Sequence, residues 1–353
     1  YYYSWKDSDG AGSRNRWALA GELRMPVLER LNLSVAGRYD QYRFAGRDPG
    51  KFTWSTGLEW RPIDSLLARA SYGTAFRAPD LHYVFAGPGN DETSGVDFWR
   101  CAVEEPDTDP SDDCSYSDEG IIRGRSGSPD LRPETSTSWT AGFVWSPLSN
   151  ADLSVDWFDI DMRDQVQDLR VNTVLRNEAD CRLGVQPIGS PLCVDTLSRI
   201  TRLSDDSLYS VFVNPINIAR ERTSGLDVSG NLRFETGIGL FRLNGGYTWV
   251  RTHDIQQYPD EPVVDMFAIN SGYDIPRTKA TLRLSWERDA WQASIQGRRL
   301  GRLPNDDSYF EIWDADSGND PWIGATYRYN ANVQFNFTDA AQLSLTVVNL
   351  FDK

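Results

Sequence analysis

Residues 278–286 read Thr278-Lys279-Ala280-Thr281-Leu282-Arg283-Leu284-Ser285-Trp286. From Ala280 onward every second side chain is apolar, and the side chains between them are polar or charged. Successive side chains of a β-strand point to opposite faces of its sheet, whereas a helix would scatter them around a cylinder. The stretch therefore predicts a strand with one apolar and one polar face.

The same alternation recurs along the whole chain. Residues 31–40 place Leu31, Leu33 and Val35 between polar neighbours, and residues 327–337 alternate Tyr, Ala, Val and Phe with Arg, Asn and Gln. The pattern predicts strands near residues 14–25, 31–42, 53–61, 66–76, 134–146, 151–163, 209–234, 238–252, 277–287, 291–302, 327–337 and 342–349.

Short and long connections alternate between these predicted strands. The chain turns within a few residues at 25–31, 61–66, 146–151, 234–238, 287–291 and 337–342. The connections at 43–52, 77–133, 164–208, 253–276 and 303–326 fall between those turns and are mostly long, polar and rich in Gly, Pro and Asp. One edge of the sheet should therefore carry only hairpin turns, and the other edge all the long loops.

A lipid-facing barrel explains the apolar face better than a soluble one. A strand of ten residues tilted near 45° covers roughly 23 Å, close to the apolar band of an outer-membrane barrel. A soluble sandwich or lipocalin-like barrel also alternates, but about twelve strands would enclose too much space for apolar side chains to fill. Tryptophans near strand ends suggest interfacial girdles, namely Trp17, Trp54, Trp60, Trp139, Trp145, Trp249, Trp286 and Trp291. Charges on the polar face suggest a wet interior, namely Glu59, Arg69, Arg233, Arg242, Arg283 and Arg298.

The four cysteines lie in two of the long connections. Cys101–Cys114 and Cys181–Cys193 are the economical disulfides among three connectivities, and they suit an oxidising compartment. A zinc site is the alternative, but no CxxC pair exists and the chain has only two histidines, His82 and His253.

Acidic residues account for the net charge of −15 and gather in the long connections. Nucleic-acid binding is not expected, because phosphate recognition needs a basic surface. A solvated loop rim explains these residues, while clustered carboxylates also allow a calcium site at Asp107, Asp109, Asp112 and Asp113 without the EF-hand spacing.

Four segments carry a family resemblance. Residues 72–81 (YGTAFRAPDL) resemble the strand-to-loop signature of TonB-dependent outer-membrane receptors, and residues 131–135 (LRPET) resemble that family's re-entry strand. Residues 223–228 (TSGLDV) and 348–353 (VNLFDK) are similar to two later segments of the family. The motif residues are Tyr72, Gly73, Phe76, Arg77, Pro79, Leu131, Pro133, Glu134, Gly225, Asn349, Leu350 and Phe351.

These motif residues also have structural explanations. Pro79 enforces an extended exit from its strand, and Pro133 marks a strand entry because proline donates no ladder hydrogen bond. Gly225 allows a bulge or a close backbone approach, and a slip of phase at Trp157-Phe158 predicts a second bulge.

The resemblance implies an all-β fold, an antiparallel up-and-down transmembrane β-barrel of about 22 strands plugged by an N-terminal domain. Residues 1–353 would be the C-terminal portion of that barrel, with about 12 strands, and the plug, the first strands and the last strand would lie outside the chain. It further implies a monomer in outer-membrane lipid, with extracellular long loops and periplasmic short turns. The TonB-ExbB-ExbD system would act through the plug.

The resemblance also implies energy-coupled uptake of a scarce nutrient, most often a ferric siderophore, without a resident cofactor. A cobalamin or sugar receptor and a passive porin are the alternatives. An outer-membrane hydrolase is a remote one, because only two imidazole bases and no G-x-S-x-G segment are present. The longest connection holds side chains that could stack on, or pair with, an anionic aromatic chelate: Arg77, His82, Tyr83, Phe85, Trp99 and Arg100. The alternative is that these side chains only pack the folded loop.

Overall fold

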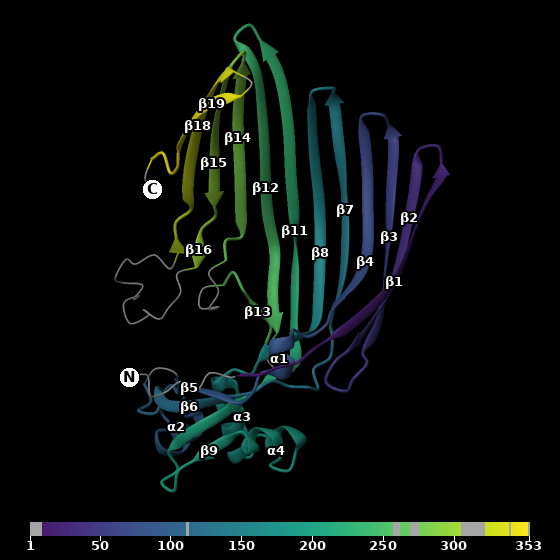
Figure 1. Ribbon diagram of the computed structural model, residues 1–353. Helices are drawn as coiled ribbons and strands as arrows, with labels where there is room; N and C mark the ends of the chain where they lie inside the picture. The colour runs from purple at the N-terminus through teal and green to yellow at the C-terminus, as the bar shows by residue number, and fades with distance from the viewer. Residues whose placement is uncertain are drawn as a thin grey trace.

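The computed structural model describes residues 9–110, 113–256, 262–268, 275–304, 322–338 and 340–351. Most of them form one antiparallel sheet that curves into an open wall (Figure 1). The strands follow the order β1-β2-β3-β4-β7-β8-β11-β12-β14-β15-β18-β19, and β13 (Val264–Asp265) pairs with β12. Each of the twelve predicted segments contributes one strand to this order. Their bounds are β1 (Asn15–Leu28), β2 (Leu31–Arg43), β3 (Gly50–Ile63), β4 (Leu66–Arg77), β7 (Glu134–Leu148), β8 (Ala151–Asp168), β11 (Pro215–Thr236), β12 (Gly239–Gln256), β14 (Thr278–Arg288), β15 (Trp291–Leu300), β18 (Thr326–Thr338) and β19 (Ala341–Val347).

The connections divide between the two edges of the wall as predicted. Short turns at residues 29–30, 64–65, 149–150, 237–238 and 289–290 join hairpins at one edge, called here the turn edge. The long connections leave from the opposite edge, called the loop edge (Figure 1). Each main strand therefore runs in the direction opposite to its neighbours, which is an up-and-down arrangement.

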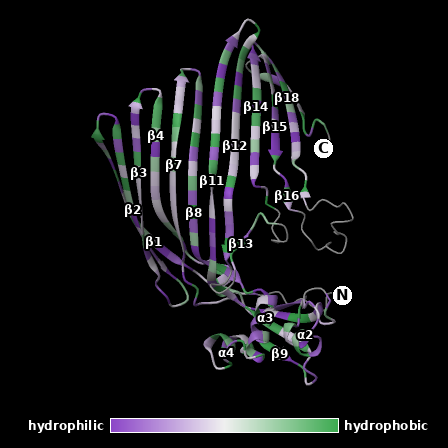
Figure 2. Ribbon diagram, turned by 180° about the vertical axis from the view of Figure 1, so that it is seen from behind, coloured by the Kyte–Doolittle hydropathy of each residue, from purple (hydrophilic) through white to green (hydrophobic). Residues whose placement is uncertain are grey.

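The two faces of the wall have opposite chemistry. Cross-strand neighbours share a face, so Leu243 on β12, Leu284 on β14 and Ile295 on β15 form one continuous apolar row. Figure 2 shows the resulting alternation of hydrophobic and hydrophilic bands along each strand. Large side chains of the apolar face are open to the outside, up to 72 % exposed for Leu19. Exposure of this kind suits a lipid environment and not the filled interior of a soluble barrel.

Tryptophans mark both ends of the apolar face. Trp17, Trp54 and Trp139 lie toward the loop edge, and all three are exposed. Trp60, Trp145 and Trp291 lie toward the turn edge and are also exposed. Such paired belts suit the two interfaces of a bilayer, where an amphipathic ring meets both lipid and water.

Two long connections fold together into a compact unit, called here the loop subdomain (Figure 1). A four-stranded sheet in the order β5-β6-β10-β9 is flanked by three helices, and β6 and β10 pair in parallel. Val211, Leu175 and Ile121 are among its buried core residues. The elements are β5 (Gly89–Gly95), α2 (Phe98–Glu104), β6 (Glu119–Arg125), α3 (Val171–Arg182), α4 (Pro191–Ser198), β9 (Ile200–Arg202) and β10 (Leu208–Val213).

The start of the predicted strand 209–234 is therefore wrong. Residues 208–213 form β10 of the loop subdomain, and only β11, from Pro215, belongs to the wall. Pro215 separates the two strands, because proline lacks the backbone N–H that a continuing ladder would need.

A second small core joins the loop edge of the wall. Tyr42, Ala78, Val84, Leu131 and Val166 are buried together where β2, β4 and β8 end, and Phe44 lies with them. The helix α1 (Leu81–Phe85) contributes Val84 to this rim core and packs Tyr83 and Phe85 against it. Two short strands, β16 (Leu303–Pro304) and β17 (Trp322–Ile323), pair beyond β15.

One of the two predicted bulges is confirmed. The pairing of β11 with β12 shifts register between Ser224 and Gly225. The bulge predicted at Trp157-Phe158 is wrong, because the register of β8 runs without a shift there against both neighbours. Phe158 instead faces the polar side and covers Gly225, where an added Cβ would lie 2.8 Å from the phenyl ring. The apparent slip in phase comes from this inward aromatic side chain.

Both predicted disulfides are present. Cys101 on α2 pairs with Cys114, and Cys181 on α3 pairs with Cys193 on α4. Each closes a short segment within the loop subdomain. No helix in the described part of the chain is long and apolar enough to cross a membrane.

Candidate functional site

Ion pairs satisfy many of the arginines on the polar face of the wall. Arg69 donates two hydrogen bonds to Asp156, at 2.8 and 2.5 Å, and a third to Ser154. Arg242 pairs with Glu287 at 2.7 Å. Asp40 is only 2 % exposed and lies between Arg16 and Arg38. Arg24 pairs with Glu59 in the same way. These pairs neutralise much of the polar face from β1 to β12.

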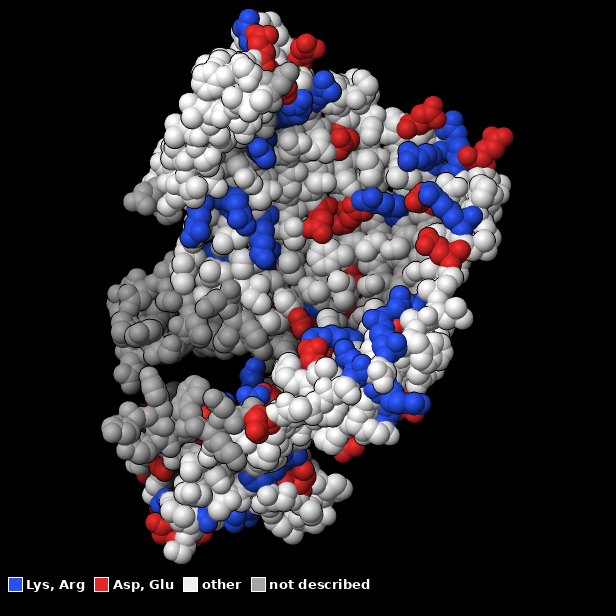
Figure 3. Space-filling view, viewed as in Figure 1, with Lys and Arg blue, Asp and Glu red and all other residues white. Residues whose placement is uncertain are grey.

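Four cations near the other end of the wall have no such partner among the described residues. Lys279 and Arg283 on β14, Arg298 on β15 and Arg328 on β18 share the polar face, and we call them the basic patch. Arg298 and Arg328 are direct cross-strand neighbours, an arrangement in which like charges destabilise a sheet. None of the four forms a salt bridge with a described acidic residue. Figure 3 shows Lys and Arg gathered on this part of the concave face.

The basic patch is a group of positive charges without a described acidic partner, and Arg233 on β11 is a further one on the same face. Unpaired cations that share one concave surface attract anions and concentrate them locally. Guanidinium groups bind carboxylates and other oxyanions with two parallel hydrogen bonds. The wall can therefore offer an anion several donors from three neighbouring strands.

The family-motif residues near the rim core pack against it or form hydrogen bonds and ion pairs there. Leu131 and Phe76 pack in or against the rim core, and Phe76 meets the Tyr42 ring edge to face at 5.8 Å. Glu134 accepts a hydrogen bond from the backbone N–H of Val166 at 2.8 Å. Arg77 approaches the other oxygen of Glu134 at 3.7 Å and also pairs with Asp80. The Pro79 carbonyl accepts a bond from Arg14.

The remaining motif residues lie elsewhere on the wall. The Tyr72 ring lies 5.2 Å from the Trp54 ring on the apolar face, tilted by 42°. Gly73 follows Tyr72 in β4, and Pro133 directly precedes β7. The backbone N–H of Asn349 donates to the side chain of Asn330, and that of Leu350 donates to the Tyr329 carbonyl. Phe351 meets the Tyr329 ring edge to face. Each of these contacts shapes or ends a strand.

Four of the six predicted ligand contacts cluster beside the rim core. His82 is exposed, and its ring lies 4.1 Å from that of Tyr83. Tyr83 and Phe85 are partly buried against the rim core, and Arg77 is exposed but held by its two carboxylates. His82 and Arg77 therefore present the accessible polar groups of this cluster.

The other two predicted contacts are half-buried in the loop subdomain. The guanidinium groups of Arg182 and Arg202 lie 4.6 and 4.7 Å from the centre of the Trp99 ring. Arg100 pairs with Glu104 at 2.8 Å and stacks on the Tyr116 ring at 4.0 Å. The structure does not bring Trp99 and Arg100 together with the rim group.

A buried ion cluster joins the two halves of the loop subdomain. Arg202 on β9 is 7 % exposed and donates to Asp97 at 2.6 and 2.8 Å. It also donates to Glu178 on α3 at 2.8 and 2.7 Å, and Glu178 is fully buried. Burial opposes the charged form of Arg202, but these hydrogen bonds outweigh it and raise the pKa of the guanidinium. The cluster connects residues from two separate connections of the wall.

Hydrogen bonds also shift the pKa values of Glu104, at the end of α2, and of the partly buried Tyr116. Bonds from Arg100 and then from the Tyr116 hydroxyl lower the pKa of the Glu104 carboxyl. The same bond to Glu104 raises the pKa of Tyr116. This triad holds the Cys101–Cys114 segment against the helix.

The calcium site that the sequence allows at Asp107, Asp109, Asp112 and Asp113 lies partly outside the described residues. Among them, no group of three or more His, Cys, Asp or Glu side chains is arranged to hold a metal ion. Asp107, Asp109 and Asp113 are described, whereas Asp112 lies outside the described residues.

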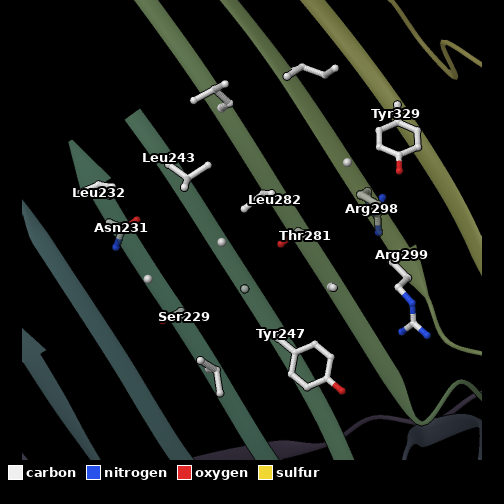
Figure 4. Close-up of a pocket in the computed structure, with 18 of the residues that line it drawn as sticks. Ser229, Asn231, Leu232, Leu243, Tyr247, Thr281, Leu282, Arg298, Arg299 and Tyr329 are labelled. Carbon is white, nitrogen blue, oxygen red and sulfur yellow. The ribbon is translucent and has the colours of Figure 1, made fainter. Parts of the chain in front are cut away.

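A hollow of about 930 Å³ lies on the apolar face. It is lined by β11, β12, β14, β15 and β18, with Ala151 and Asp152 of β8 at one end (Figure 4). Gly230, Gly245 and Gly297 occupy one cross-strand row within it, and their missing side chains leave the hollow. Leu243, Leu282 and other aliphatic side chains line it, so it does not suit a charged nutrient.

Comparison with known sequences settles the family. Residues 1–350 match the family described as "TonB dependent receptor-like, beta-barrel". The chain belongs to the TonB-dependent receptor β-barrel family. The resemblance carried by residues 72–81 and 131–135 is thereby confirmed. A search of curated proteins found no match.

Solved TonB-dependent receptors share the fold at low sequence identity. The siderophore receptor PirA from Acinetobacter baumannii is 15 % identical, with a TM-score of 0.61, and the match covers 96 % of this chain and 42 % of PirA. A mutant of the ferric enterobactin receptor PfeA from Pseudomonas aeruginosa, solved with enterobactin, is 15 % identical with a TM-score of 0.62, over 97 % and 40 %. The ferric-catecholate import receptor Fiu from E. coli is 13 % identical with a TM-score of 0.56, over 98 % and 41 %.

The chain thus spans about two fifths of the length of these receptors. The family is described as a receptor β-barrel, and PirA, PfeA and Fiu are each named as receptors. The lipid-facing assignment of the apolar face agrees with that membership.

Proposed function

We propose that this barrel wall belongs to an outer-membrane receptor that imports an anionic metal chelate, with a ferric siderophore as the substrate. The basic patch carries the proposal. Lys279, Arg283, Arg298 and Arg328 present four positive charges on one concave face, without a described acidic partner. Elsewhere on this face Arg69 and Arg242 are neutralised by carboxylates.

The chemistry of the patch favours an anion over a neutral nutrient. A ferric complex of several catecholate or hydroxycarboxylate arms carries net negative charge and many oxygen acceptors. Arginine can meet those oxygens with paired hydrogen bonds, and lysine adds a point charge. A neutral sugar or a corrinoid would leave the like-charge pair Arg298 and Arg328 uncompensated.

The family and the structural neighbours support the same substrate class. Three of those neighbours are named for siderophores, ferric enterobactin or ferric catecholates. In this proposal the long loops face outward and meet the chelate first, with His82 and Arg77 as accessible contacts at the loop edge. Energy would come from the TonB-ExbB-ExbD system.

Uptake by the complete protein tests the proposal. A strain that lacks the gene should lose growth on at least one ferric chelate under iron limitation, and the wild-type gene should restore it. The triple variant Lys279→Gln, Arg298→Gln and Arg328→Gln should restore growth poorly although it reaches the outer membrane. Its matched control is Arg242→Gln with Glu287→Gln, which removes a pair from the same face and leaves the net charge unchanged. Unchanged uptake of every ferric chelate by the deletion strain would contradict the proposal.

A further inference from the structure

The hollow on the apolar face, called here the glycine furrow, has two different walls. Toward the turn edge lies an aliphatic row of Leu232, Leu243, Leu284 and Ile295. Toward the loop edge lies a row that contains Tyr247, Arg299 and Tyr327 (Figure 4 labels the first two). Between these rows, the three glycines and Leu282 form the floor. The furrow is therefore apolar on one side and polar-tipped on the other.

Arg299 is an unusual residue for this face. Its cross-strand neighbours are Ala280 on β14 and Tyr327 on β18, so its side chain shares the face of the aliphatic row. It donates to the Thr278 hydroxyl at 2.8 Å and to the Tyr327 hydroxyl at 3.2 Å. No described carboxylate forms a salt bridge with it. A cation directed at lipid is costly unless it reaches an anion or the interface.

The position of Arg299 along the wall matches the depth of a lipid headgroup. It lies in the next-to-last position of β15, at the loop edge, whereas the aliphatic row lies further toward the turn edge. Tyr247 and Tyr327 flank it in the same cross-strand row, and tyrosine favours the headgroup level. The headgroup end and the tail end of a lipid would thus meet the polar-tipped and the aliphatic wall, respectively.

The dimensions of the furrow fit one lipid tail. From β11 to β18 it crosses five strands, which is roughly 19 Å at about 4.8 Å per strand spacing. Its volume of about 930 Å³ lies within the range of small-molecule sites. The glycine row lets neighbouring side chains lean over the floor: a Cβ on Gly297 would lie 3.1 Å from the Tyr329 ring, and one on Gly245 would lie 3.3 Å from Leu282. A larger side chain at either position would push these neighbours into the furrow and narrow it.

We propose that the glycine furrow is a binding site for a single membrane lipid with an anionic phosphate headgroup. One acyl chain lies on the glycine row against the aliphatic wall, and the phosphate pairs with the Arg299 guanidinium beside the two tyrosine hydroxyls. The charge of Arg299 and its place above an apolar furrow distinguish this site from the general lipid annulus. The inference does not depend on which nutrient the receptor imports.

Native mass spectrometry of the complete protein tests the site. The protein is reconstituted with equal amounts of dioleoyl phosphatidylglycerol and dioleoyl phosphatidylcholine, which share acyl chains and differ in net charge, and then extracted in mild detergent. One phosphatidylglycerol should be retained in preference. Arg299→Gln should reduce that retention roughly tenfold, since a charge-assisted hydrogen bond contributes about that factor, and Arg299→Lys should keep most of it. Arg233→Gln, an arginine on the polar face of β11, is the matched control.

A second variant tests the shape of the furrow while the charge of Arg299 stays in place. Gly297→Leu fills the floor and should abolish retention of the phosphatidylglycerol while Arg299 remains. Gly21→Leu places the same side chain on the apolar face of β1, where nothing lies within 4 Å, and should have no effect. Heat-modifiable mobility on gels confirms that each variant is folded. Equal retention of the two lipids, or full retention by both Arg299→Gln and Gly297→Leu, overturns the proposal.

Discussion

The buried ion cluster of the loop subdomain leads to a strong prediction about stability. Replacement of Arg202 by Met keeps the apolar stem but leaves Asp97 without its cation and leaves Glu178 with Arg182 alone. Their side chains are 1 % and 0 % exposed, so water cannot replace the lost bonds. Removing one partner of a buried ion pair costs about 3–5 kcal/mol. The opening equilibrium of the subdomain should therefore rise by roughly two to four orders of magnitude, at about 1.4 kcal/mol per tenfold.

Hydrogen exchange measured by mass spectrometry on the complete protein checks this value. Peptides from α3 and β5 should lose protection in Arg202→Met, while peptides from β14 and β15 should not change. The matched control is Arg43→Met, whose pair with Asp48 is exposed on both sides and should contribute less than about 1 kcal/mol. The triple variant Arg202→Met, Asp97→Asn and Glu178→Gln should recover part of the protection, because no buried charge is left. Wild-type protection in Arg202→Met would falsify the reasoning.

Three further predictions concern the wall and the loop subdomain. Gly225→Val should destabilise the wall by about 1–3 kcal/mol, because a Cβ would lie 2.3 Å from the Trp249 carbonyl oxygen. The folded fraction on heat-modifiability gels measures this loss, with Gly246→Ala as the mild control. Equal folding of the two variants would contradict the prediction. The double variant Cys101→Ser with Cys114→Ser should lose about 3 kcal/mol of subdomain stability. Peptide mapping of the wild-type protein without reductant should recover Cys101 joined to Cys114 and Cys181 joined to Cys193. Free thiols at these sites would refute the pairing. The hydrogen bond from Tyr116 to Glu104 should be fully effective below the ordinary tyrosine pKa of about 10 and be lost as pH rises through the raised pKa of Tyr116. The alkaline absorbance difference between wild type and Tyr116→Phe measures that pKa, and Glu104→Gln should return it toward normal; no change in Glu104→Gln would contradict the assignment.

The wall could be predicted from the sequence because its order is local. Each strand is followed by its neighbour, and period-two patterns such as 278–286 specify both the strand and its two faces. The family motifs could be assigned for a similar reason, since residues 72–81 and 131–135 are contiguous segments. The false bulge at Trp157-Phe158 arose because an inward aromatic over Gly225 mimics a slip in register.

The loop subdomain could not be predicted as a unit, because long-range contacts hold it together. Arg202 and Asp97 lie 105 residues apart, and the parallel pairing of β6 with β10 joins two separate connections. Some local signals were nevertheless present. Val171, Val174, Leu175 and Ala179 follow a helical spacing in α3, and Ser190 with Pro191 is a typical helix start for α4.

The candidate site shows the same division. Arg283 and Arg298 could be placed on the polar face from alternation alone. Arg69 and Arg242 have acidic partners, whereas Arg283 and Arg298 have none among the described residues. This difference depends on the cross-strand register between distant segments. Trp99 and Arg100 are near Arg77 in the sequence, but the fold places them in the loop subdomain, packed against Arg202 and Tyr116.

A nitroxide scan of β14 tests the central claim most directly. Single cysteines replace residues 279–286, one at a time, in the complete protein reconstituted into liposomes, and each spin label is exposed to oxygen or to a water-soluble nickel chelate. Labels at Ala280, Leu282 and Leu284 should be accessible to oxygen from the lipid, and labels at Lys279, Thr281 and Arg283 to the nickel chelate. Accessibility should alternate with period two, and the two reagents should be out of phase. In-phase profiles, or a period near 3.6, would contradict a wall with one lipid-facing and one water-facing side.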